Sequence, residues 1–133
     1  MGSGAHRKLI VWQESMKMVE LVYKVTRAFP AEERFGLSEQ MRRAAISVPS
    51  NIAEGAARNS VRELLHYVGV ANGSLAELDT QIEASMRLGY VCDIHELEEQ
   101  TSKIGRLMVA LRRSLRARGM DSDKHYRNLP TTG

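Results

Sequence analysis

One row of apolar residues constrains the fold of this chain more than any other feature. Between Ser60 and Gly89, apolar side chains recur at alternating spacings of four and three residues, at Leu64, Val68, Ala71, Leu75, Leu78 and Ile82. This spacing places them on one face of an α-helix and is typical of helices that pack side by side in a left-handed bundle. We therefore predict a long helix that buries this row, which is called the seam below.

Capping signals indicate where this helix begins and where the next one follows. Ser60 and Glu63 have the spacing of a capping box, in which the serine hydroxyl accepts from the Glu63 amide and the glutamate reaches back. Gly89 is expected to end the helix, and the segment 93–96 has the pattern of a second capping signal. The helix that follows is expected to end at Gly119 and to bury Leu97, Ile104, Met108, Leu111 and Leu115.

Two helices are predicted before the seam. The first begins at Leu9 and ends before Pro30, because proline disfavours helical geometry at the preceding residue and lacks a donor. Its apolar stripe is expected at Trp12, Met16, Val19 and Tyr23, joined by Val11, Met18, Val22, Val25 and Phe29. The charged residues 31–36 are interpreted as a loop with at most one helical turn.

The second helix is predicted to start at Ser38 as its N-cap and to close in a short turn after Gly55. Pro49 lies inside it, so we expect either a kink there or a break from which Ser50 restarts the helix. Arg42 and Arg43 are expected to point away from the apolar side. That side consists of Leu37, Met41, Ala44, Ala45, Val48 and Ile52.

Composition agrees with an all-helical domain. Aromatic residues make up 5% of the chain, hydrophobic residues 43% and charged residues 26%, which favours one helical core over a β-sandwich or a disordered chain. Since short connections make successive helices antiparallel, we predict an all-α, up-down-up-down four-helix bundle over residues 9–118. Residues 1–8 are interpreted as an N-terminal extension and residues 119–133 as a mobile C-terminal tail.

The sequence also bears on location and on chemistry. No apolar run approaches the ~20 residues that cross a bilayer, and the first six residues lack the hydrophobic stretch of a signal peptide, so we expect a cytoplasmic protein without a membrane partner. The single cysteine, Cys92, excludes an intramolecular disulfide and is interpreted as a packed small residue. Phosphate-loop, nucleophile-elbow and zinc-helix motifs are absent from the sequence.

One short motif resembles a metal-binding pattern. Glu63 and His66 form a Glu-x-x-His pair, as in di-iron bundles, but such sites need a second copy of the motif and two further glutamates. The second copy is missing, and Glu63 already serves the capping box. His66 is interpreted as an ordinary surface or interface side chain, and we expect no cofactor, no metal and no enzymatic activity.

Charge is segregated along the chain. Residues 1–59 carry nine Lys and Arg against six Asp and Glu, residues 60–99 carry two against eight, and residues 100–133 carry eight against two. Basic segments of this kind suit a nucleic-acid partner. Charge-matched packing between helices or subunits, or simply solvated helix faces, would produce the same pattern.

Two features of the helices are candidates for contacts beyond the core. Gly69, Gly73 and Ala76 lie opposite the seam, and because each mid-helix glycine costs about 1 kcal/mol relative to alanine, a close backbone approach there is expected. Asn51 and Glu54 form a polar pair beside Pro49. This pair either satisfies the carbonyl that the proline frees or bonds to another helix, or it shapes a polar binding surface with the neighbouring arginines.

Several stretches together are similar to a known family. They are Leu9 to Gln13, Phe29 and Pro30 with Glu33 to Leu37, the run from Gln40 to Gly55 that contains Ser-Val-Pro-Ser-Asn-Ile-Ala-Glu-Gly, and Gly73 to Leu78. In these residues the chain resembles the 23S rRNA intervening-sequence proteins, which are bacterial four-helix bundles. Members are encoded within inserts in rRNA genes or as free-standing genes, and a relative is the accessory protein of the reverse transcriptase of diversity-generating retroelements.

The resemblance implies a pentameric barrel of bundles with basic surfaces suited to nucleic acid. We accordingly expect a non-enzymatic homo-oligomer that contacts the phosphates of RNA or DNA through arginine-rich helix faces. The alternative is a protein scaffold or accessory subunit, whose client would be a reverse transcriptase or another protein. The candidate nucleic-acid-binding residues are Arg42, Arg43, Arg58, Arg106, Arg112, Arg113 and Arg116.

Overall fold

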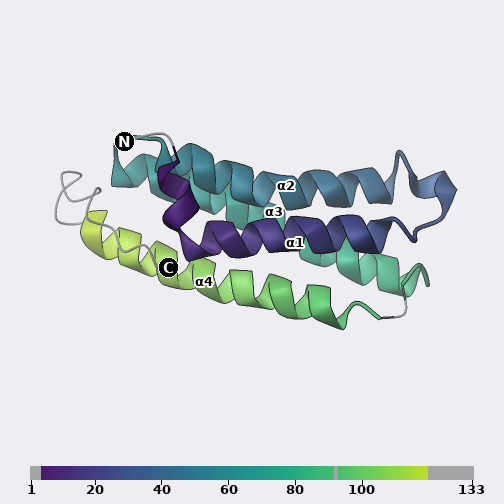
Figure 1. Ribbon diagram of the computed structural model, residues 1–133. Helices are drawn as coiled ribbons and strands as arrows, with labels where there is room; N and C mark the ends of the chain where they lie inside the picture. Colours follow the sequence, from purple (N-terminus) through teal and green to yellow (C-terminus); the bar gives the residue numbers. More distant parts are fainter. Residues whose placement is uncertain (1–3, 92, 120–133) are drawn as a thin grey trace.

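The computed structural model describes residues 4–91 and 93–119 (Figure 1). In these ranges the chain is helical and contains no strand. The elements are η1 (Ala5–Lys8), α1 (Ile10–Thr26), η2 (Ala31–Glu33), α2 (Leu37–Ala56), α3 (Val61–Arg87) and α4 (His95–Gly119). The predictions for Cys92 and for residues 120–133 lie outside the described residues. The short η2 confirms the single helical turn expected between the first two helices.

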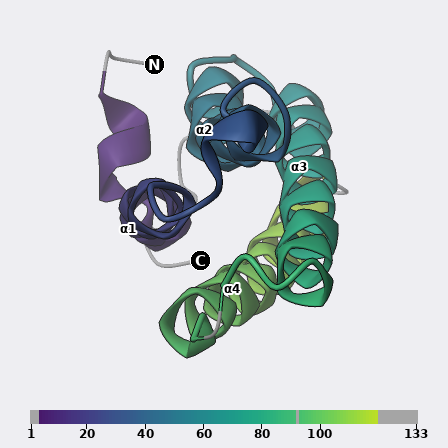
Figure 2. The same ribbon diagram turned by 90° about the vertical axis from the view of Figure 1, so that its right-hand side faces the viewer.

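The four α-helices form an up-down-up-down bundle, as predicted. Each helix packs against the next in sequence, and α1 packs against α4 to close the bundle (Figure 2). One end of the bundle holds the start of α1, the α2–α3 turn and the end of α4, whereas the α1–α2 and α3–α4 loops lie at the opposite end (Figure 1). These are called the terminal end and the loop end.

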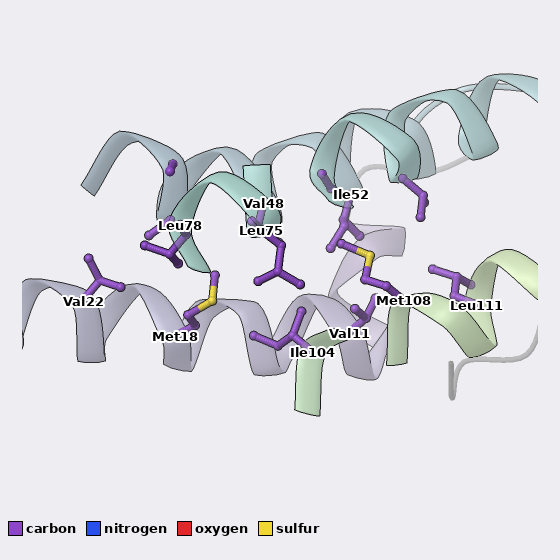
Figure 3. Packing of buried hydrophobic residues seen from close by; sticks show 14 of the residues in the cluster. Val11, Met18, Val22, Val48, Ile52, Leu75, Leu78, Ile104, Met108 and Leu111 are labelled. Carbon is purple, nitrogen blue, oxygen red and sulfur yellow. The ribbon is translucent and has the colours of Figure 1, made fainter. Parts of the chain in front are cut away.

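The core is continuous through all four helices. Every residue of the seam is buried, and so is each apolar residue predicted for the buried face of α4. Met18 and Val22 of α1, Ile52 of α2, Leu75 and Leu78 of α3 and Met108 of α4 all belong to this one cluster, and Figure 3 shows them between the helices. The periodicity of these helices therefore determined their buried faces.

The orientation of α1 differs from the prediction by about one residue. Val11, Met18 and Val22 are fully buried, whereas Met16 is 40% exposed. Polar residues share the buried face, because Ser15 and Thr26 donate their hydroxyls to backbone carbonyls one turn earlier, at 2.6 and 2.7 Å. A hydroxyl satisfied inside its own helix is compatible with burial, so hydrophobicity alone misplaces this face.

The prediction that Ser38 caps α2 is wrong. The N-cap position is Gly36, and Ser38 is buried inside the first turn. The capping acceptor is instead Glu33 from η2, whose Oε1 accepts from the Leu37 amide at 3.1 Å. The other carboxylate oxygen accepts from the Tyr90 hydroxyl at 2.7 Å, which joins the two loops of the loop end. These bonds lower the pKa of Glu33, and the bond to Glu33 raises the pKa of Tyr90.

Pro49 is buried within α2, which is continuous through it, so the alternative of a helix restarting at Ser50 is wrong. The carbonyl freed by Pro49 belongs to Ala45, but Asn51 donates to the carbonyl of Ser47 at 2.8 Å. Asn51 also donates to the Ser47 hydroxyl, which pairs with the hydroxyl of Ser74 on α3 at 2.8 Å. The polar side chains near Pro49 therefore link α2 to α3.

Gly55 lies in the contact between α2 and α3. A Cβ at this position would stand 2.9 Å from both Leu64 Cδ1 and Tyr67 Cβ, and 3.3 Å from the Leu64 carbonyl oxygen. Gly55 was expected to terminate the helix, and it does lie one residue before its end. Its missing side chain also lets the two helices approach each other closely.

The predicted ends of α3 agree with the structure. The Ser60 hydroxyl accepts from the Glu63 amide at 3.2 Å, which is one half of the capping box, and no return bond from the Glu63 side chain occurs among the described residues. Gly89 follows the helix with a φ of 75°, a left-handed conformation that favours glycine. Asp93 accepts from the His95 amide at 3.2 Å at the start of α4.

Candidate nucleic-acid interface

The fold divides the charges of the bundle between its two halves. The terminal half comprises residues 4–13, 54–66 and 106–119, and it carries nine Lys and Arg against two glutamates. The loop half comprises residues 20–43, 77–91 and 93–103, and it carries seven Lys and Arg against eleven Asp and Glu. Segregation along the sequence thus becomes segregation in space, which gives the terminal half a field that attracts anions.

Three of the predicted arginines form a row on the outer face of α4. Arg106, Arg113 and Arg116 are exposed and lie on the side of the helix away from its buried residues. None of the three makes an ion pair or hydrogen bond with another described residue. Val109, which is 56% exposed, lies between them. This arginine row is free to contact a ligand.

Arg112 lies on a different side of α4. It follows Gly105 by two turns, and Gly105 faces Leu75 of α3, so Arg112 lies on the flank nearest α3. Its side chain is half-buried, and Nε is buried without a hydrogen-bond partner among the described residues. The structure therefore separates Arg112 from the exposed row.

The prediction that Arg42 points away from the bundle is wrong. Arg42 is half-buried, its guanidinium lies 4.5 Å from the centre of the Tyr23 ring, and its Nε donates to the Thr26 hydroxyl at 2.8 Å. It joins α2 to α1, because rotation of α2 turns this position toward α1. Arg43 does point away, and its side chain is 80% exposed with Glu39 at 3.8 Å.

Arg58 is also engaged within the bundle. It donates to Glu54 at 3.1 Å and to the Tyr67 hydroxyl at 2.9 Å, and its guanidinium lies 5.0 Å from the centre of the Tyr67 ring. These contacts hold the turn between α2 and α3. The guanidinium thus has internal partners that a phosphate would have to displace.

Four other cations join the terminal half, and sequence reasoning missed them. Lys8 and Arg62 are exposed, while Arg7 lies 5.5 Å from the centre of the Trp12 ring. Arg118 lies in the last turn of α4. These cations could have been predicted from the fold class. In an up-down-up-down bundle, the start of the chain, the α2–α3 turn and the end of α4 all lie at the same end.

The glycine positions on α3 are open. Within the described chain, no atom lies within 4 Å of the place where a Cβ would stand at Gly69 or Gly73. Gly73 and Ala76 are exposed. The close backbone approach expected at these residues therefore does not occur within one described chain.

The Glu-x-x-His motif of Glu63 and His66 has no further metal-ligating side chains grouped with it among the described residues. His66 is exposed and contacts the Tyr67 ring edge to face at 5.0 Å. Within the residues that the structure covers, no three His, Cys, Asp or Glu side chains are grouped so that they could hold a metal ion.

A buried carboxylate attaches α4 to α1. Glu14 is 6% exposed, and it accepts from Gln100, Lys17 and Lys103, each at 3.0 Å. Hydrogen bonds from these three partners lower the pKa of Glu14 from 4.5 to about 2, against the opposing effect of burial. We call this group the Glu14 clamp. It ties the first half of α4 to α1.

Comparison with known proteins adds the identity of the family. None of the described helices is long and apolar enough to span a membrane. A search of curated proteins found no match. A family description, 23S rRNA-intervening sequence protein, matches residues 7–110, which covers α1 to α3 and most of α4. The chain therefore belongs to the family of 23S rRNA-intervening sequence proteins.

Proposed function

We propose that this protein is a non-enzymatic, homo-oligomeric module that binds RNA or DNA through phosphate contacts. The observation that carries the proposal is the arginine row of Arg106, Arg113 and Arg116, which is exposed and free of partners among the described residues. Arginine donors of this kind bind phosphate oxygens strongly. They supply affinity without reading base sequence.

Among the seven candidate arginines, the contacts favour a subset. Arg106, Arg113 and Arg116 serve as primary phosphate contacts, with Arg43 as a separate exposed cation on α2. Lys8 and Arg62 extend the surface over the terminal half. Arg42 and Arg58 act chiefly in packing, since both have partners inside the bundle.

The oligomer is proposed to be a closed ring, a pentamer as the family resemblance implies. The open surface at Gly69, Gly73 and Ala76 supports a contact with another copy. We expect Gly73→Leu to weaken assembly and Ala110→Leu, at an exposed position of α4, to leave it intact. Sedimentation that detects only monomer of the wild type at micromolar concentration would refute the ring.

The decisive experiment reverses the arginine row. The variant Arg106→Glu, Arg113→Glu, Arg116→Glu is compared with Lys24→Glu, Arg27→Glu, Arg87→Glu, which changes net charge equally but in the loop half. Fluorescence anisotropy with mixed-sequence duplex RNA and DNA, at several salt concentrations, measures affinity. The plot of log affinity against log salt has a negative slope. Loss of three phosphate contacts should make this slope shallower, by about 2 to 3 for duplex DNA.

The control variant should keep a slope close to that of the wild type. Equal losses in both variants would indicate a response to net charge alone and would remove α4 from the binding surface. If the wild type binds neither nucleic acid at low salt, the accessory or scaffold role replaces the nucleic-acid role.

A further inference from the structure

A groove of about 560 Å³ lies at the loop end, and its last lining residue on α4, Glu99, precedes Arg106 of the arginine row by about two helical turns. Its apolar lining comes from the second half of α1 and the turn after it, and from the start of α4 and the segment that leads into it. These residues are Leu21, Val25, Ala28, Val91, Ile94 and Leu97. Ile94 and Leu97 belong to the buried core, while Leu21, Val25 and Val91 are half-exposed. The groove therefore continues the core outward to solvent.

The groove is bounded at both ends by polar contacts. On one side, the Glu14 clamp draws α4 to α1 through Gln100 and Lys103. On the other side, Tyr90 is held by its bond to Glu33 and by the Phe29 ring, whose centre lies 5.4 Å from that of Tyr90. Leu21 and Val25 of α1, together with Ala28 in the turn just after it, span about 10 Å of chain. That length suits about two turns of a helix.

The rim of the groove is asymmetric in charge. Asp93, Glu96 and Glu99 line the side formed by α4, and Lys24 lines the side formed by α1. Glu99 is paired with His95 at 3.0 Å, whereas Glu96 and Lys24 are exposed and have no partner among the described residues. The rim therefore offers a carboxylate row to one flank of an occupant and a single ammonium group to the other.

We propose that this groove docks an amphipathic helical segment of another protein. The segment has two apolar residues one turn apart, which fill the groove, and lysine or arginine on the flank that faces Glu96 and Glu99. A helix fits because the groove lies between two helices, where apolar side chains at i and i+4 can insert. Basic residues fit because they complement the acidic rim and the net negative loop half.

This site is independent of the proposed nucleic-acid surface. The carboxylates of the rim repel phosphate, so a nucleic acid is disfavoured as the occupant. The two surfaces lie on different halves of the bundle. One chain can therefore hold a nucleic acid at the terminal half and a protein partner at the loop half.

The probe is a stapled helical peptide of about 14 residues with two leucines one turn apart and lysines along one flank. A second peptide has glutamates in place of the lysines. Binding to the full chain is measured by fluorescence anisotropy, and the contact surface is mapped by amide chemical-shift changes. We expect the lysine peptide to bind with shifts centred on Leu21, Val25 and Ile94, and the glutamate peptide not to bind.

Two pairs of variants test the site without disturbing the core. Glu96→Lys should weaken binding of the lysine peptide about tenfold, whereas Glu98→Lys, an exposed glutamate two residues away that does not line the groove, should change it less than about twofold. Ala28→Trp should fill the groove and abolish binding. Ala57→Trp, at an exposed alanine just after α2, should have no effect.

Three results would overturn the proposal. One is the absence of binding by the lysine peptide. Another is that, in either pair, the test variant and its control change the affinity for the lysine peptide equally. The third is a shift of the groove residues that depends on protein concentration without peptide and disappears in Ala28→Trp, since this would make a second copy of the chain the occupant. Because the arginine row is intact in all of these variants, their results are separate from the nucleic-acid test.

Discussion

The α2–α3 and α1–α4 contacts are built in opposite ways. Between α2 and α3 a glycine, Gly55, brings the helices so close that a Cβ would stand 2.9 Å from side-chain atoms of the other helix. Between α1 and α4 the connection is a buried carboxylate, Glu14, with hydrogen bonds from Gln100 and Lys103. The first contact combines a close steric fit with one hydroxyl pair, Ser47 and Ser74, whereas the second depends on a localised polar clamp.

This difference explains where ligands have room to bind. The close α2–α3 pair has the most extensive contacts of any two helices in the bundle. The α1–α4 pair is joined at the Glu14 clamp, and beyond it the helices leave the apolar groove. The rest of α4 presents its outer face to solvent with the arginine row. Both proposed binding surfaces therefore involve α4, which packs less extensively against its neighbours than α2 and α3 do.

The strongest test of the comparison substitutes glycines of opposite environment. Gly55→Ala should lower the free energy of unfolding by about 2 kcal/mol, because the added methyl forces α2 and α3 apart. Gly105→Ala, in the interior of α4, should raise it by about 0.5 to 1 kcal/mol, because alanine favours the helix and a Cβ there would lie 4.0 Å from its nearest neighbour, Leu75 Cδ2. Urea denaturation measures both. If Gly55→Ala stabilised the protein as Gly105→Ala does, the steric account of the α2–α3 contact would be wrong.

The second test removes the charge of the clamp. Glu14→Gln should lower the free energy of unfolding by about 1 to 2 kcal/mol at pH 7, since the charge-assisted bonds weaken while two of the donors remain partly solvated. Amide hydrogen exchange should accelerate in α1 and α4 and not in the α2–α3 contact. Uniform acceleration in all four helices would contradict a local clamp.

The same substitution has a defined pH dependence. Folding lowers the pKa of Glu14 from 4.5 to about 2, so its stabilisation is complete above pH 4.5 and is lost as the pH falls toward 2. The wild type should therefore approach the Glu14→Gln variant in stability over this interval. A constant difference between the two proteins down to pH 2 would show that the charge of Glu14 is not responsible.

The third test compares two arginines near the α2–α3 turn. Arg58→Met should cost about 1 kcal/mol, because it removes the bonds to Glu54 and Tyr67 and the cation–π contact, while the salt dependence of nucleic-acid affinity stays unchanged. Arg62→Met should leave stability unchanged and reduce the salt slope by about 1. Thermal denaturation and anisotropy measure the two effects. Reversed outcomes would exchange the structural and binding roles of these residues.

The smallest expected effects separate the two lysines of the clamp. Lys103→Met removes a bond between helices and should cost about 0.5 to 1 kcal/mol, whereas Lys17→Met removes a bond within α1 and should cost about 0.3 kcal/mol. Both lysines are about half exposed or more, which limits each contribution. Chemical denaturation at low and high salt would resolve them. A larger effect at Lys17 would place the clamp within α1 alone.

Local sequence signals predicted much of the fold and less of the candidate site. The seam, the Ser60 cap and Gly89 depend on spacing and backbone conformation within one segment, and each is found where it was expected. The sequence also predicted the three arginines of the row, because they lie opposite the strongly periodic buried face of α4. By contrast, Arg42 and Arg58 look equally basic in the sequence, and only the neighbouring helices determine that they pack inside the bundle.

By itself the sequence determined that this chain forms four amphipathic helices with a segregated charge pattern, because periodicity and composition are properties of each helix alone. Tertiary structure decided the rotation of α1, the capping of α2 by Glu33 and the burial of Glu14. It also decided that Gly55 lies in a close contact between α2 and α3, whereas no atom of another described helix lies within 4 Å of the place where a Cβ would stand at Gly73. Each of these depends on atoms brought close from distant parts of the chain, and that proximity exists only once the helices have packed.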